Sequence, residues 1–341
     1  MDNTLDRRTA LRLGGAATVA AVAGCSDLLG GGGSSSGSSS TQYSQYLSVG
    51  DNQVFFAYAD FEALEEFNTG EQGGGGGGDE NPSLDEPMLA PASGLILIAF
   101  TAGFQLGALG LGGLIQTESE SDLESQGNQI LVANSAVVIA GEMNTDEIDE
   151  QLTSTSSDNS LAAEYEQVDE SDGYTFYEPA GENQSSGVVA VNDSELLSAD
   201  SRDGVDAVID AINGDGRAAD EFDEFQWLLD NGGDGIMAFG GYGPDGFSGS
   251  NSGSGNDSES NQFSFVENSG GFVGSISLDS ETASSVLAAS SEQISEDQRE
   301  QIESDLQSDQ TDVSIDFRGD GRLVAEATYS RDVLEGGNSE T

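Results

Sequence analysis

The sequence predicts an α+β fold with a mostly antiparallel sheet, several amphipathic helices and a disordered N-terminal tether. Short strand-like segments outnumber helical ones, and many are joined in pairs by short polar turns, as antiparallel strands are. Apolar residues recur at helical spacing in a few separate segments. A unit of strand, small polar cap and amphipathic helix begins near Val54, Val137, Glu195 and Phe272. The units differ too much in length for a solenoid, which leaves one or two α+β domains.

Residues 1–24 have the pattern of a secretory signal peptide. Two adjacent arginines, Arg7 and Arg8, precede an apolar run from Leu13 to Ala23. At about 1.5 Å per residue this run reaches only about half of the roughly 30 Å hydrocarbon core, so it is too short to cross a membrane. We therefore predict cleavage before Cys25.

The same stretch carries two recognisable motifs. The pair Arg7-Arg8 resembles the twin-arginine export signal, and Val22-Ala23-Gly24-Cys25 resembles the lipobox of lipoproteins. A lone cysteine is most often a small buried core residue, but the position and flanks of Cys25 favour lipidation. The resemblance implies a protein that is exported, lipidated on Cys25 and anchored to the outer face of the cell membrane.

The composition is extremely acidic. The chain has 63 Asp and Glu against nine basic residues, all of them Arg, with no His and a formal net charge of −54. Such a surface repels itself at ordinary ionic strength, whereas at molar salt the Debye length falls to about 3 Å and the repulsion is screened. With its signal, the chain resembles the twin-arginine-exported lipoproteins of halophilic archaea. We expect no nucleic-acid partner, because phosphate binding needs clustered Lys or Arg.

The predicted body begins after a spacer. Residues 25–47 comprise the lipidated Cys25 and a Gly/Ser tether, which spans about 25 to 30 Å on average. The body, residues 48–243, opens with a buried strand over 54–59 and a short helix capped by Asp60. A disordered glycine-rich insertion is predicted at 70–83.

The uncharged stretch from Leu95 to Ile115 is long enough for a transmembrane helix. A crossing here would place the strand at 54–59 and its partner strands on opposite sides of the membrane, and five glycines weaken a lone helix. We therefore expect a buried or membrane-surface hairpin or helix, with a membrane-spanning segment as the alternative.

Further strands and helices follow in order. Ile130–Ala140 has the composition of a strand covered on two faces, and a helix with Asn144 and Glu147 at its start comes next. Strands at 165–168 and 174–177 flank a five-residue loop, and a second hairpin joins 188–191 to 195–197.

Helices are expected over 205–212, ending at Gly214, and over 222–229, where Trp227 lies beside a core-facing stripe. Beyond a Gly/Ser/Asn linker or loop at 244–261, residues 262–330 form an α+β part of the same or a second domain. Its expected elements are a hairpin (262–266, 272–278), a helical stretch (286–306) and a hairpin (313–317, 323–329). Residues 331–341 are predicted to be a disordered tail.

No motif for a catalytic, cofactor or metal site stands out. Without His, Lys or a second Cys, the chain has no Ser-His-Asp triad, histidine-held zinc, P-loop lysine or free thiolate. Aspartates near 230–235 and 316–321 resemble parts of calcium loops but lack the required ligands, so we interpret them as turns. Three sequons, at Asn183, Asn192 and Asn256, are possible N-glycosylation sites.

We therefore expect a non-enzymatic, lipid-anchored surface protein with an interaction or envelope role, in contact with the membrane and with an envelope protein or transporter. The alternatives are a solute-binding lipoprotein of a transporter, with a cleft between two lobes, and a carboxylate-dependent glycan hydrolase, with two carboxylates about 5 to 9 Å apart.

Overall fold

The computed structural model describes a single large sheet covered on both faces. The described residues are 41–50, 52–68, 87–89, 102–103, 105–115, 123–134, 136–154, 164–181, 187–243, 269–279, 282–308, 311–319 and 321–330. They belong to one compact unit, Ser40–Thr341. The predictions for residues 1–40, the insertion at 70–83, the linker at 244–261 and the tail at 331–341 lie outside the described residues.

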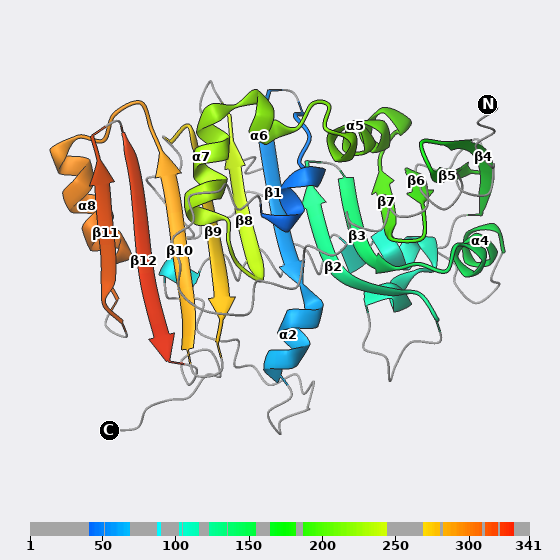
Figure 1. Cartoon of the computed structure of the whole chain (residues 1–341), viewed down its shortest axis with the longest axis horizontal. Helices are drawn as coiled ribbons and strands as arrows, with labels where there is room; N and C mark the ends of the chain where they lie inside the picture. Colours follow the sequence, from blue (N-terminus) through cyan, green and yellow to red (C-terminus); the bar gives the residue numbers. More distant parts are fainter. Residues whose placement is uncertain are drawn as a thin grey trace, which may run out of the picture. The chain divides into compact units, whose positions relative to one another are not determined.

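Twelve strands form an antiparallel sheet in the order β11-β12-β10-β9-β8-β1-β2-β3-β7-β6-β5-β4 (Figure 1). The strands are β1 (Val54–Asp60), β2 (Gln126–Ala133), β3 (Ala136–Glu142), β4 (Tyr165–Ser171), β5 (Tyr174–Pro179), β6 (Val188–Val191), β7 (Glu195–Ala199), β8 (Met237–Tyr242), β9 (Gly271–Leu278), β10 (Thr282–Ser290), β11 (Val313–Arg318) and β12 (Arg322–Ser330). The α+β class with a dominant antiparallel sheet is confirmed.

The helices cover the two faces of this sheet. They are η1 (Gln42–Tyr46), α2 (Phe61–Asn68), η2 (Pro87–Leu89), η3 (Gly112–Ile115), α4 (Thr145–Thr153), α5 (Arg202–Asn213), α6 (Ala218–Glu221), α7 (Asp223–Gly232) and α8 (Glu296–Leu306). Strand β1 shows the layering, because Phe56 and Tyr58 join the core under η1, α5 and α7, while Ala57 and Ala59 join the core on the opposite face with α4. A further cluster on that opposite face holds α8 and η2.

Several helix ends and hairpins lie where capping and turn residues in the sequence predict them. Gly214 ends α5 in the left-handed conformation with φ of 96°. The side chain of Asn144 accepts a hydrogen bond from the backbone N–H of Glu147 at the start of α4, and Ser295 caps α8. Two further hairpins, β4–β5 and β6–β7, are also as expected, although Asp172-Gly173 forms a two-residue turn instead of a five-residue loop.

The first residues of the body differ from the prediction. Residues 41–47 were assigned to the tether, but they form η1 and its flanks, with Tyr43 and Leu47 only 1% and 0% exposed. The carbonyl of Leu47 also accepts a hydrogen bond from the N–H of Ala218. The folded body therefore includes this segment, because its apolar side chains fill the core above β1.

Two other predictions were wrong in detail. Residues 282–290 form strand β10, not the start of a helix, because the segment lies between β9 and β12 and pairs with both. Ile130–Ala140 is not one strand but parts of β2 and β3, and the chain reverses at Asn134, whose φ is 51°. In both places tertiary pairing decides the structure.

The described part of the uncharged stretch packs against the sheet. Leu106, Leu109, Leu111 and Leu114 are all buried in the core cluster that contains α4. Among the described residues, no helix is long and apolar enough to cross a membrane.

Candidate functional site

The structure describes one of the site residues singled out from the sequence. Cys25, Arg7, Arg8, Asn183 and Asn256 lie outside the described residues. Asn192 lies in the turn between β6 and β7. Its Oδ1 accepts hydrogen bonds from the backbone N–H groups of Ser194 and Glu195, both at 2.8 Å, and from the Ser194 hydroxyl at 3.1 Å. The side chain that would carry a glycan is thus already engaged in forming the turn.

A hollow with a volume of about 370 Å³ opens between the segment after η1 and helices α5 and α6. Its wall carries three carboxylates, Asp210, Asp215 and Glu221, together with the ring of Phe222. The turn from Gly214 to Gly216, both at positive φ, brings Asp215 to the rim. The remaining lining residues are Ser48, Val49, Asn52, Ala207 and Gly216.

Arg217, although adjacent in sequence to this hollow, serves the helix. Its Nε donates to the carbonyl of Ala211 at 2.6 Å and its Nη2 donates to the carbonyl of Ile212 at 2.9 Å. The guanidinium therefore binds two of the last carbonyls of α5, and that of Ala211 also accepts a hydrogen bond from the backbone N–H of Gly214. None of the residues lining the hollow is basic, so its chemistry would favour a cationic solute.

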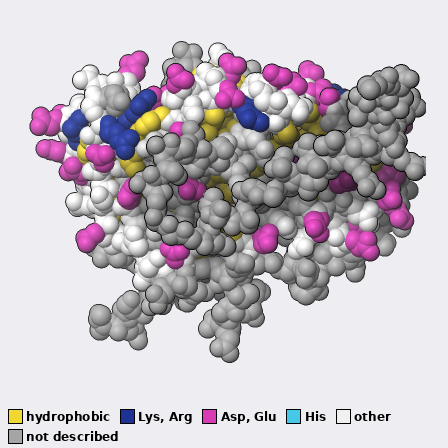
Figure 2. All heavy atoms as spheres, viewed as in Figure 1, with side chains coloured by type: hydrophobic (Ala, Val, Ile, Leu, Met, Phe, Trp, Pro, Cys, Tyr) yellow, Lys and Arg dark blue, Asp and Glu magenta, His cyan; other side chains and the backbone are white. Residues whose placement is uncertain are grey.

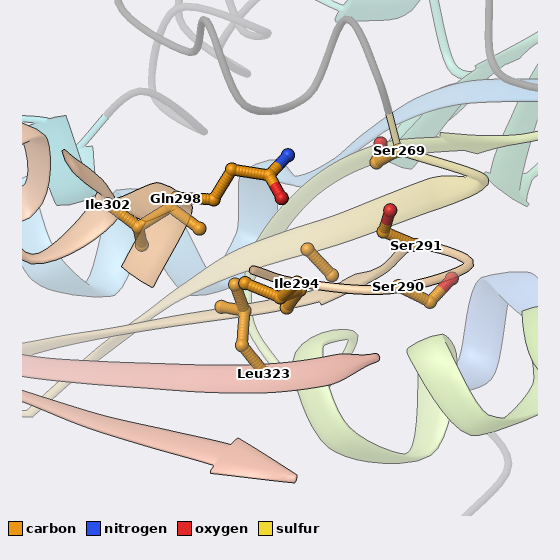
Figure 3. A pocket seen from close by; sticks show the side chains of 8 residues that line it. Ser269, Ser290, Ser291, Ile294, Gln298, Ile302 and Leu323 are labelled. Carbon is orange, nitrogen blue, oxygen red and sulfur yellow. The ribbon is translucent and has the colours of Figure 1, made fainter. Parts of the chain in front are cut away.

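A smaller pocket lies where α8 crosses the end of β10 (Figure 3). Gln298, Ser269 and Ser291 lie along one side, and Ile294 and Leu323 lie on the other. Its volume of about 20 Å³ is enough for roughly one water molecule. The Oε1 of Gln298 already accepts hydrogen bonds from Ser295 in the capping box of α8, so this pocket reads as a packing gap beside a helix cap.

A carboxylate and two tyrosines form a hydrogen-bonded cluster on the sheet. Glu195 accepts from the hydroxyl of Tyr46 at 3.0 Å and from the hydroxyl of Tyr174 at 2.5 Å. Burial, with the nearby carboxylate, raises the pKa of both tyrosines, so they remain neutral donors. The cluster ties η1 to β5 and β7. Sequence reasoning missed it because no local pattern links three residues so far apart.

The single tryptophan is covered by arginines. The guanidinium carbons of Arg318 and Arg322 lie 5.5 and 4.7 Å from the ring centre of Trp227, and Arg322 binds Glu224 with nitrogen–oxygen distances of 2.6 and 3.0 Å. Trp227 is partly buried against the core. Figure 2 shows the few basic side chains among many acidic ones on this face. The contacts join α7 to the β11–β12 hairpin.

The aspartates that resemble calcium-loop residues belong to ordinary elements. Asp230 lies in α7, where burial raises the pKa of its carboxyl, and Asp316 lies in β11. Within the described ranges, no group of three or more His, Cys, Asp or Glu is arranged to hold a metal ion.

No protein-family model matches the chain, and no curated protein matches it. Among solved structures, the chain is similar to crystal forms I, III and IV of TP0453. Identity is 11% for forms I and III and 10% for form IV, with TM-scores of 0.40, 0.39 and 0.39. The matches cover 85–87% of this chain and 94–96% of the other. A likeness at this level supports no functional inference.

Proposed function

We propose that the protein is a lipid-anchored cell-surface protein with a non-enzymatic interaction or envelope role. The observation that carries this proposal is Cys25 at the end of a signal-like segment that begins with Arg7 and Arg8. The sequence from Leu13 to Ala23 is too short to remain in the membrane as a span, so a lipid on Cys25 would provide the anchor.

The composition of the body supports an exterior, saline location. The amphipathic helices that we infer would turn apolar stripes to the sheet and acidic faces outward, as in α8, where Ile302 and Leu306 are buried while Glu300 and Glu303 are exposed. An acidic coat of this kind is compatible with a compact state when salt screens its repulsion.

The anchor is tested by replacing its single thiol. Cys25→Ser should release the mature protein into the medium, because Cys25 is the single cysteine of the sequence. Ser26→Ala, one residue further on, is the control and should leave the protein in the membrane fraction. Immunoblots of membrane and medium fractions at native salt give the answer, and a membrane-bound Cys25→Ser protein would contradict the anchor.

A solute-binding role is the second candidate, favoured by the hollow of about 370 Å³ with its carboxylate wall. A pull-down of the anchored protein at native salt separates the two functions. Recovery of a transporter permease would favour solute binding, and recovery of an envelope protein would favour the interaction role. We do not propose the glycan hydrolase, because no particular pair of described carboxylates stands out for its two roles.

A further inference from the structure

The geometry points to the outer edge of β11 as a docking site where an extended segment of a partner protein adds a strand to the sheet. This inference rests on the proposed interaction role and specifies the kind of partner. Main-chain hydrogen bonds would supply the affinity, and side chains at alternate positions would supply the specificity.

The first argument comes from an internal correspondence between the two halves of the sheet. Strands β1 and β8 lie side by side at the centre. Outward from them follow β2, β3, β7 and β6 on one side and β9, β10, β12 and β11 on the other. Helix α4 follows β3 as α8 follows β10. In this correspondence β11 matches β6. The outer edge of β6 pairs with β5 of the inserted β4–β5 hairpin, whereas no described strand pairs with the outer edge of β11.

The second argument is the helix beneath that edge. In the first half, Ile148 and Leu152 of α4 share a core cluster with Tyr177 of β5, and burial together with the nearby Asp149 carboxylate raises the pKa of the Tyr177 hydroxyl. Thus α4 supports the added hairpin from one face of the sheet. In the second half, α8 packs on the same face beside the edge strand β11, as Figure 1 shows at the left margin.

The matching residues on α8 define what the partner should carry. Ile302 and Leu306 have the spacing of Ile148 and Leu152, so Glu303 takes the place of Asp149. Glu303 is exposed. A strand added beside β11 would therefore lie over α8, with apolar side chains facing the helix and a Tyr, Lys or Arg facing Glu303.

The backbone of β11 is suited to this pairing. The N–H of Gly321 donates to the carbonyl of Arg318, and the carbonyl of Gly321 accepts from the N–H of Ser291 on the β10 side. Because alternate residues of an antiparallel strand direct their backbone groups to opposite sides, the backbone groups of Arg318 face β12. Those of Val313, Ile315 and Phe317 then face outward.

The two edges of the sheet differ in how they discourage pairing. The register of β11 with β12 runs without interruption from Val313 to Arg318. Strand β4, at the other edge, has a bulge between Gln167 and Asp169, and its exposed positions include Glu166 and Glu170. Both edge strands carry exposed charges, which in β11 are Asp316 and Arg318, but only β4 has a bulge, a feature that protects an edge from further strands. The contrast favours β11 as the edge open to a partner.

A second copy of the chain is a poor occupant of this edge. Two β11 strands related by a two-fold axis perpendicular to the sheet would bring both α8 helices to the same face beside one edge. Each helix carries five acids in its sequence EDQREQIESDL, so the two would compete for space and repel each other. The site therefore suits an extended segment without a helix at that position.

The test uses the full chain carrying Cys25→Ser, purified in mild detergent so that it is available whether or not it is released, and a synthetic peptide of residues 173–179, which contains β5. At molar salt, millimolar peptide should slow hydrogen exchange at the outward amides of Val313, Ile315 and Phe317. Val313→Pro removes one outward N–H at the first residue of the strand, a position that tolerates proline. The matched control Val313→Ala keeps that N–H. Peptide binding should be about tenfold weaker in Val313→Pro than in Val313→Ala.

Several results would overturn the proposal. The first is that millimolar peptide does not slow exchange, and the second is that the two variants bind the peptide equally well. The third is that the outward amides are already protected in the purified monomer, which would mean that the chain covers its own edge. Self-association that Val313→Pro abolishes would assign the edge to a second copy. Because the measurement does not use the lipid, its failure leaves anchoring through Cys25 intact, and failed anchoring leaves the peptide result unchanged.

Discussion

Residues 41–47 offer the sharpest test of where the folded body begins. The side chain of Leu47 is fully buried in the core under η1, so Leu47→Ala should lower the free energy of unfolding by about 2 to 5 kcal/mol. The hydroxyl of Tyr43 donates to the buried carbonyl of Gly233 at 2.8 Å. Tyr43→Phe leaves that carbonyl without its partner and should cost about 1 to 3 kcal/mol.

Urea unfolding in molar potassium chloride measures both changes. With a slope of roughly 3 kcal/mol per molar urea, a loss of about 3 kcal/mol lowers the midpoint by about 1 M. Gln45→Ala is the matched control within η1, because Gln45 is exposed and its truncation should change stability by no more than about 0.5 kcal/mol. If Leu47→Ala unfolds at the same urea concentration as Gln45→Ala, the segment belongs to the tether and the reasoning fails.

Two further predictions concern polar contacts. Glu147 accepts hydrogen bonds from Ser125 and from the N–H of Glu124, and these outweigh burial and lower its pKa. The contribution of Glu147 to stability is therefore present above its unfolded pKa and is lost as pH falls through its lower folded pKa. The urea midpoints of the wild type and Glu147→Gln should accordingly begin to converge below about pH 4.5. A constant difference between the two midpoints down to pH 3 would contradict this prediction. Arg217→Met should cost about 1 to 3 kcal/mol, because the Ile212 carbonyl loses its guanidinium donor and the Ala211 carbonyl keeps only the backbone N–H of Gly214. Arg299→Met, which removes a guanidinium 5.2 Å from the ring of Phe317, should cost about 1 kcal/mol or less. Equal urea midpoints for the two arginine variants would refute the capping role.

The elements predicted correctly are those whose information is local. Helix α5 has apolar residues at helical spacing, and Gly214 supplies the left-handed residue that ends it. The prediction of a helix starting at Val286 was wrong. Leu287, Ala288 and Ala289 are good helix formers, but this segment belongs to strand β10, which pairs with β9 at eight positions and with β12 at nine. Propensity is a weak signal when a segment has two strand partners distant in sequence.

The same distinction applies to the candidate sites. The proposed export motif at Arg7 and Arg8 and the proposed lipidation motif ending at Cys25 are each contiguous in sequence, so a sequence pattern alone suggests them. The hollow beside α5 joins residues near 50 with residues near 215, and the edge of β11 acquires meaning only through its correspondence with β6. No periodicity or motif records such relations, because they depend on strand order.

The placement of the arginines indicates which charged contacts salt would weaken least. At molar ionic strength, exposed charges farther apart than about 3 Å scarcely interact, so long-range ion pairing adds little. Arg202 lies 3.5 Å from the ring centre of Phe176, Arg322 stacks over Trp227, and Arg217 donates to helix carbonyls. These contacts act at short range and are partly shielded from solvent, so salt weakens them less than exposed ion pairs. In the proposed saline location, cohesion of the body would therefore depend on the buried core and such contacts, while salt would screen the repulsion among the many carboxylates.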